Sequence, residues 1–126
     1  MAIGARVIVQ LKELLKAQAV KLTCTIPAGS LANTEYWLTI SANRLIVKTV
    51  RIVTDAEIKA NMVAVYDSEY EYLLPEDQAE STDVTYNLSD WCEGGVECRE
   101  FSVVAIASSD TTADRVLTAY VYYAYI

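Results

Sequence analysis

The stretch that decides the fold reads Arg115-Val-Leu-Thr-Ala-Tyr-Val-Tyr-Tyr-Ala-Tyr125. It contains no glycine or proline, and most of its residues are β-branched or aromatic, which suits a pleated strand. Successive side chains on a strand point to opposite faces, so this strand is apolar on both faces. The run Phe101-Ser-Val-Val-Ala-Ile-Ala107 has the same property. The end of the chain therefore predicts strands that need cover on two sides.

The rest of the chain repeats short strand-like runs separated by turn residues. We predict strands at residues 20–26, 34–40, 44–54, 61–66, 69–74, 85–88, 98–107 and 115–125. Turns are predicted at Pro27-Ala-Gly-Ser30, at Ser41-Ala-Asn43 and at Gly94-Gly95. About eight short strands without alternating helices indicate an all-β fold, an antiparallel sandwich or jelly-roll.

The N-terminal segment has a different pattern. Apolar side chains at Val7, Leu11, Leu14, Leu15 and Ala19 follow the spacing of one helix face. We therefore predict a short N-terminal helix or arm over residues 1–19, followed by a β-sandwich domain over residues 20–126. A strand through residues 6–9 is the rival interpretation.

The two-sided strands leave apolar surface to be covered. Either the N-terminal helix lies on it, or a neighbouring subunit does, because large exposed apolar patches usually mark interfaces. Tyrosine suits such a contact, since its ring is apolar and its hydroxyl tolerates water. The candidate interface residues are Leu11, Leu14, Leu15, Tyr120, Tyr122, Tyr123 and Tyr125.

The charge of the chain is acidic and unevenly spread. Its formal net charge is −7, which disfavours direct binding to nucleic acid. Residues 1–54 carry seven bases and two acids, whereas residues 55–100 carry thirteen acids and two bases. This asymmetry fits docking on an acidic neighbour, a second copy included. The simpler interpretation places the acids on solvated loops.

Targeting signals are not evident in the sequence. No run of 18 uncharged apolar residues occurs, so we predict no membrane-spanning helix and no membrane partner. The N-terminus does not have the form of a signal peptide, because Lys12, Glu13 and Lys16 interrupt its apolar run. We expect the protein to be made in a cytoplasm and to leave it only inside a particle.

The residues that usually carry catalysis are scarce. The chain has no histidine, which removes histidine bases, histidine-containing catalytic dyads and triads, and histidine metal ligands. The alternating acids Asp67, Glu69 and Glu71 fit a solvated acidic edge better than a calcium site. We therefore predict no enzyme, no catalytic residue, no metal and no cofactor.

Cysteine pairing remains open from the sequence. A hairpin turn at Gly94-Gly95 would bring Cys92 and Cys98 close enough for a disulfide. Two unpaired thiols are the alternative that a reducing cytosol favours. Cys24 lies in a strand-like run and is typical of a small buried residue.

The order of elements from Leu45 onward resembles small β-sandwich proteins of tailed-phage particles. The resemblance starts with the basic strand Val47-Lys-Thr-Val-Arg-Ile-Val53 and continues through Tyr66-Asp67 and a tyrosine-rich acidic segment to Tyr72. It ends with Phe101-Ser-Val-Val-Ala-Ile106 and Tyr120-Val-Tyr-Tyr-Ala-Tyr125. These relatives include head-decoration or cement proteins and tail or fibre modules. The resemblance covers about two-thirds of the chain and carries over no site residue.

The resemblance implies a non-enzymatic virion structural protein. Such a protein binds a capsid or a neighbouring virion protein, associates with itself, often as a trimer, and acts by burying surface. The alternative function is a carbohydrate-binding β-sandwich module, in which Trp37, Trp91 or the tyrosines would form a sugar platform.

Overall fold

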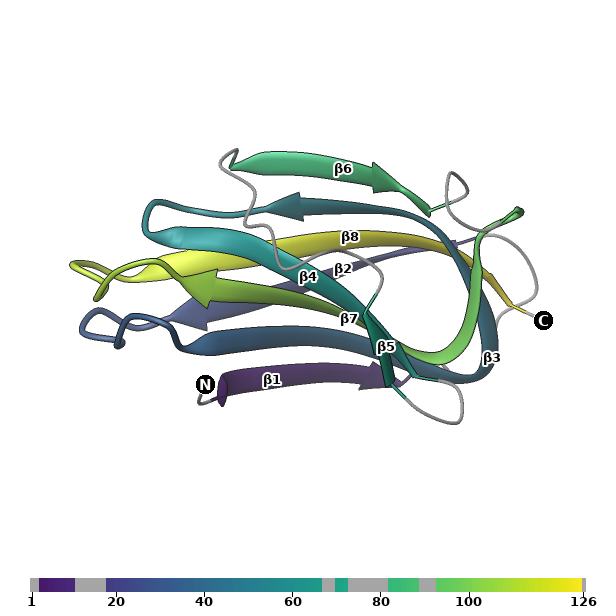
Figure 1. The fold of residues 1–126 in the computed structure, drawn as a ribbon, viewed down its shortest axis with the longest axis horizontal. Helices are drawn as coiled ribbons and strands as arrows, with labels where there is room; N and C mark the ends of the chain where they lie inside the picture. The colour runs from purple at the N-terminus through teal and green to yellow at the C-terminus, as the bar shows by residue number, and fades with distance from the viewer. Residues whose placement is uncertain (1–2, 11–17, 67–69, 73–81, 89–92, 126) are drawn as a thin grey trace.

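The computed structural model describes residues 3–10, 18–66, 70–72, 82–88 and 93–125. These residues form eight strands, shown in Figure 1. The strands are β1 (Ile3–Gln10), β2 (Gln18–Ile26), β3 (Glu35–Val53), β4 (Ile58–Tyr66), β5 (Tyr70–Tyr72), β6 (Asp83–Asn87), β7 (Val96–Ala107) and β8 (Arg115–Tyr125). The predicted all-β class is confirmed.

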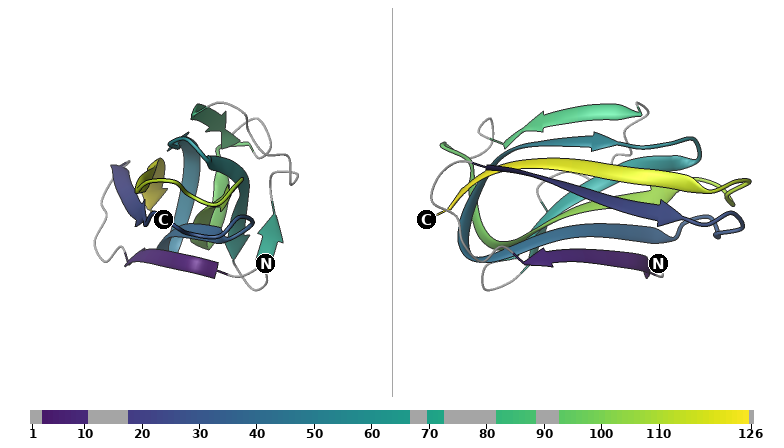
Figure 2. Two further views of the ribbon diagram at one scale, coloured as in Figure 1. Left: turned by 90° about the vertical axis from the view of Figure 1, so that its left-hand side faces the viewer. Right: turned by 180° about the vertical axis from the view of Figure 1, so that it is seen from behind.

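One long strand, β3, builds both layers of the fold. Its first half, residues 35–41, pairs with β1 and β7, and its second half, residues 45–53, pairs with β8 and β6 and, at residues 45–47, also with the start of β7. The register shifts between Ser41 and Leu45, where the pairing to β7 is interrupted. Strands that change sheets at such irregularities form the corners of β-sandwiches. Figure 2 shows β3 turning over at the end of the molecule where the C-terminus lies.

The bend of β3 divides a single hydrogen-bonded sheet into two parts. Layer A consists of β1, the first half of β3, β7, β4 and β5, and layer B consists of β2, β8, the second half of β3 and β6. All pairings are antiparallel except that of β1 with β3, which is parallel. The structure is therefore sandwich-like, with one parallel edge that the sequence did not predict.

The core lies between the two layers and follows the period of two. Alternate residues of β2, β3, β4, β7 and β8 are buried in one continuous cluster, among them Leu22, Leu38, Val63, Phe101 and Leu117. The side chains between them point away from the core, as the strand geometry requires. The β8 strand thus places Leu117, Ala119, Val121 and Tyr123 inside the molecule.

The predicted N-terminal helix is wrong: the structure contains no helix there in the part that it describes. Residues 3–10 instead form β1, which pairs with β3 from Ile3 to Gln10. Ala5, Val7 and Val9 pack against the core, whereas Ile8 is 55% exposed. The β-branched run Val7-Ile-Val9 favours this alternation, so the rival strand over residues 6–9 was the better interpretation. Leu11, Leu14 and Leu15 lie outside the described residues.

The predicted turn at residues 41–43 is a bend within β3, not a break between two strands. The predicted glycine turn is present at residues 93–94, where Gly94 and Gly95 both have positive φ. At Gly95 a Cβ atom would come within 2.7 Å of the carbonyl oxygen of Val47. Glycine is therefore required where this turn passes close to the corner of β3.

Candidate functional site

The outward face of layer B is the candidate site, and we call it the open face. Its exposed or half-buried side chains come from all four strands of the layer. They are Ala19, Lys21, Thr23 and Thr25 of β2, Val116, Thr118, Tyr120, Tyr122 and Ala124 of β8, Ile46, Thr49, Arg51 and Val53 of β3, and Asp83, Thr85 and Asn87 of β6. Threonine and tyrosine give this face a mixed polar and apolar character.

The centre of the open face is a row of side chains across the four strands. Lys21 lies opposite Tyr120, Tyr120 opposite Arg51, and Arg51 opposite Thr85. Both cations approach the ring of Tyr120, at 5.8 Å for the Lys21 ammonium and 5.5 Å for the Arg51 guanidinium, measured to the ring centroid. Cations at this distance are attracted by the ring quadrupole.

Arg51 is fixed on its other side by Asp83. The Nε and Nη2 atoms of Arg51 donate hydrogen bonds of 2.9 and 2.6 Å to the two carboxylate oxygens of Asp83. These hydrogen bonds lower the pKa of Asp83 and raise the pKa of Arg51 above its usual value. The bidentate geometry holds the guanidinium plane in place beside Tyr120.

The predicted interface tyrosines separate into different environments. Tyr120 and Tyr122 lie on the open face, and Tyr122 is 44% exposed. Tyr123 is only 4% exposed and belongs to the core, where burial raises its pKa. Tyr125 is in β8, but its side chain lies outside the described part of the structure. In the sequence, only the alternation of side chains along the strand distinguishes Tyr122 from Tyr123.

The outward face of layer A is buried at its centre, unlike that of layer B, and is exposed at β1, where Ile8 lies. Trp37, Ala64 and Val104 form a second buried cluster there. The guanidinium of Arg6 lies 5.3 Å from the centroid of the Trp37 ring. Thr39 and Ser102, both buried, share a hydrogen bond of 2.8 Å. The outward-facing side chains of Phe101–Ala107, which are Ser102, Val104 and Ile106, are therefore buried. The second face of this strand needs no neighbouring subunit to cover it.

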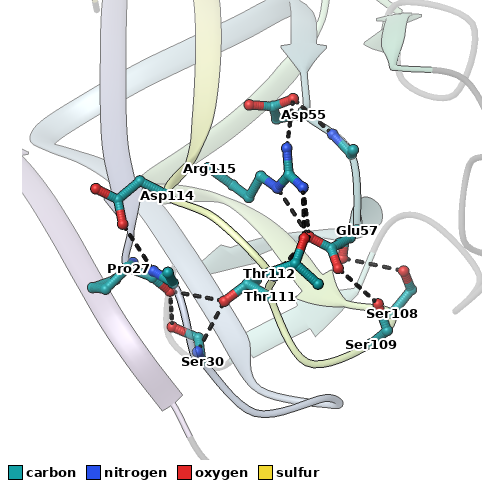
Figure 3. Close-up of polar contacts among 12 residues, drawn as sticks. Pro27, Ser30, Asp55, Glu57, Ser108, Ser109, Thr111, Thr112, Asp114 and Arg115 are labelled. Carbon is teal, nitrogen blue, oxygen red and sulfur yellow. Dashed lines mark hydrogen bonds and ion pairs between the residues drawn. The ribbon is translucent and has the colours of Figure 1, made fainter.

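A polar cluster at one end of the molecule joins the loops, as Figure 3 shows. Glu57, at a positive φ of 71°, accepts hydrogen bonds from the Thr112 backbone at 3.1 Å and from Arg115 Nε at 2.9 Å. On the neighbouring loop, the Thr111 hydroxyl donates to the Pro27 carbonyl at 2.8 Å. Because these polar groups bond one another, the cluster ties the loops together and has the character of a structural element.

The Glu57 cluster gives a pH prediction. The hydrogen bond from the Thr112 backbone, followed by that from Arg115, lowers the pKa of Glu57 below its ordinary 4.5. A carboxylate with a depressed pKa in the folded state stabilises above its unfolded pKa, and loses this contribution as the pH falls through its folded pKa. We expect Glu57→Gln to be less stable than the wild type at pH 7, with the difference shrinking between about pH 5 and pH 3.

Urea unfolding across this pH range measures the effect. Glu93→Gln, at an exposed turn residue, makes the same change of charge outside the cluster and serves as the control. A gap between Glu57→Gln and the wild type that stays constant with pH would contradict the assigned role of the carboxylate.

The remaining predicted site residues are only partly described. Cys98 is buried, but Cys92 lies outside the described residues, so the predicted disulfide stays a prediction. Cys24 is buried as expected, and burial raises the pKa of its thiol. The side chains of Asp67, Glu69 and Glu71 also lie outside the described part. In the described residues we find no group of three side chains suited to hold a metal, and none of the described elements is a helix that could span a membrane.

Comparison with known proteins identifies no family. No family model matches the chain, and no curated protein sequence matches it. Solved structures similar to it include CpGH89CBM32-6 of Clostridium perfringens, with a TM-score of 0.48, 11% identity, and 79% and 92% of the two chains covered. The structure of FlhE has a TM-score of 0.40 and 12% sequence identity, and the match covers 88% of this chain and 98% of FlhE. PliG of Aeromonas hydrophila is a periplasmic inhibitor of g-type lysozyme. Its structure has a TM-score of 0.34 and 8% sequence identity, and the match covers 94% of this chain and 97% of PliG. At these TM-scores the likeness establishes no function, and none of the three is named as a virion protein.

Proposed function

We propose that this chain is a non-enzymatic virion structural protein whose open face binds an acidic surface of a neighbouring virion protein. The protein acts by burying surface and associates with itself. The virion setting rests on the order of elements that resembles tailed-phage sandwich proteins. The binding role rests on the open face.

The observation that carries the proposal is the row Lys21, Tyr120, Arg51 at the centre of the open face. An aromatic ring held between two cations offers apolar area and positive charge in one place. Tyrosine and arginine are enriched at protein interfaces and dominate their binding energy. A four-stranded face of this kind is left uncovered by the described residues, whereas Trp37, Ala64 and Val104 at the centre of the corresponding face of layer A are buried.

Charge identifies the kind of partner. The whole chain has a net charge of −7, yet Lys21 and Arg51 are exposed on the open face. Asp83 is the only acid among the side chains of the open face, and it is bonded to Arg51. Complementary charge steers association and fixes orientation, so an acidic protein surface suits this face.

The carbohydrate-binding alternative needs rings that are free to stack on a sugar. Lys21 and Arg51 already lie against the Tyr120 ring, and Trp37 is 8% exposed with Arg6 over it. Among the described tyrosines and Trp37 on the outward faces of β3 and β8, Tyr122 is the most exposed ring. One such ring favours an interface contact over a sugar platform.

The charge of the open face can be tested with poly-L-glutamate as a stand-in for an acidic protein surface. We expect the wild type to bind it at low salt and to release it as the ionic strength rises. Lys21→Glu should weaken binding on the order of tenfold, because it reverses the charge beside Tyr120. Lys59→Glu makes the same change of net charge on β4 of layer A and should change binding less than twofold.

Equal losses in the two variants would overturn the assignment to the open face. The alternative function is tested in the same way with soluble oligosaccharides, followed by tyrosine and tryptophan fluorescence. Saturable binding of a neutral oligosaccharide that Tyr122→Ala abolishes would replace the proposed function with the carbohydrate-binding one.

A further inference from the structure

The outer edge of β2 is the longest regular strand edge of layer B. All nine residues of β2 pair with β8 without a register shift. On the opposite side of β2, no strand of the described chain pairs with it. The other edge strands are shorter or irregular: β5 has three residues, β6 has five, and β1 has a register shift between Ile3 and Ala5. A long, regular, unpaired edge is a template for another strand.

Among the residues that the structure describes, the features that usually protect an edge are weak on β2. Lys21 is the only charged residue of β2, and β2 contains no proline and no bulge. The Lys21 ammonium lies over the Tyr120 ring on β8. It therefore leans across the sheet toward β8, on the side away from the outer edge. A lysine on an edge strand discourages pairing when its charge lies along that edge. In this conformation the Lys21 charge lies over Tyr120 instead.

Charge also favours this flank for contact between like molecules. Two copies with a net charge of −7 repel each other on average. The strands β1 and β2, which lie on the same flank, contain no acidic residue among their seventeen. Of the 17 acids in the chain, thirteen lie between residues 55 and 100. A second copy can therefore approach closely along β2 where repulsion is smallest.

We propose that two copies of this chain pair antiparallel through the outer edges of β2, an inference that rests on the proposed function. Full overlap of residues 18–26 places Leu22 on the two-fold axis. In this register Lys21 lies opposite Thr23 of the second copy, and Thr25 lies opposite its Ala19. No like charges then face each other directly.

The consequence is a doubled binding surface. Layer B of the two copies becomes one continuous eight-stranded sheet, and the two-fold axis stands perpendicular to it. Both open faces then point to the same side. A partner with repeated acidic sites, such as a particle surface, is bound by two linked faces, and their effective concentration raises the avidity.

Substitutions at Thr23, which is exposed, test the register by the sign of their effect. Thr23→Glu places a carboxylate opposite Lys21 of the second copy, twice per dimer, and should tighten the dimer on the order of tenfold. Thr23→Lys places lysine opposite lysine and should weaken the dimer by a similar factor. General repulsion between acidic copies predicts the reverse order, because Thr23→Glu makes the chain more negative. Dimer dissociation constants from sedimentation equilibrium give the comparison.

The control pair is Thr85→Glu and Thr85→Lys on β6, which changes the same face and the same net charge away from β2. Circular dichroism verifies that each variant is folded. In the wild type, hydrogen exchange of the β2 amides should slow as the protein concentration rises, with β6 unaffected. The pairing is overturned by a chain that stays monomeric, by a trimer, or by the reverse order of the Thr23 variants.

These outcomes are separable from failure of the proposed function. On poly-L-glutamate, the open face predicts stronger binding by Thr23→Lys and weaker binding by Thr23→Glu, opposite to their effects on the dimer. A chain that binds poly-L-glutamate through Lys21 but does not pair through β2 keeps the acidic-surface binding of the proposed function and loses the inference. A chain that pairs through β2 without binding poly-L-glutamate loses the proposed function only.

Discussion

Phe101→Ala is expected to lower the free energy of unfolding by about 3–5 kcal/mol. Phe101 is the single phenylalanine of the chain and has 0% of its surface exposed. It lies opposite Ile40 of β3 on one side and Val65 of β4 on the other. Its removal leaves a cavity in the core between the two layers, which the rigid strands around it cannot fill.

Urea unfolding at pH 7 measures this loss. Because a domain of this size is stable by only about 5–15 kcal/mol, Phe101→Leu provides a milder variant that should stay folded and lose about 1 kcal/mol. Tyr122→Ala, on the open face, is the control and should change stability by less than about 1 kcal/mol. A cost below about 1 kcal/mol for Phe101→Ala would contradict the central position of this ring.

Val7→Asp is expected to lower the free energy of unfolding by about 2–4 kcal/mol, since it removes a packed side chain and brings a carboxylate against the core. Val7 of β1 packs against the main core cluster. Its neighbour Ile8 is 55% exposed, so Ile8→Asp should cost less than about 1 kcal/mol. Because Val7 and Ile8 are adjacent and their side chains point to opposite faces, the pair tests the two-residue period of a strand directly.

Thermal and urea unfolding of the two variants provide the measurement. Similar losses at Val7 and Ile8, or a larger loss at Ile8, would refute the placement of β1 at the edge of layer A. The same pair bears on the N-terminal segment as a whole, because β1 is hydrogen-bonded into the sheet over its length. A deletion that includes β1 therefore removes an edge strand in addition to any contact with a neighbour.

Local sequence patterns predicted the strands of this protein well where composition and period agree. The β8 stretch has β-branched and aromatic residues throughout, and it forms a strand over Arg115–Tyr125. The glycine pair after residue 93 forms the predicted turn because its positive φ values disfavour other residues. The open face was partly predictable, because the two-residue period of a strand places Tyr120 and Tyr122 on one face and Tyr123 on the other.

Long-range pairing decided what these patterns left open. The apolar positions of residues 7–19 fit a helix stripe, but β3 offers an edge whose hydrogen bonds β1 completes in parallel. The small and polar residues 41–43 are compatible with a turn, yet β3 bends through them because both of its halves find partners in opposite layers. Lys21 and Arg51 are 30 positions apart, and only their register on either side of β8 brings them to Tyr120.

The sequence by itself determined that this is an all-β chain with an acidic balance and no histidine chemistry. Its composition and its two-residue period are local properties, and they favour strands regardless of which segments the strands pack against. The tertiary structure decided which strands lie at the edges, which face is covered and which cations meet Tyr120. Those outcomes depend on hydrogen bonds between residues far apart in the chain, and no local pattern specifies which distant strand will be the partner.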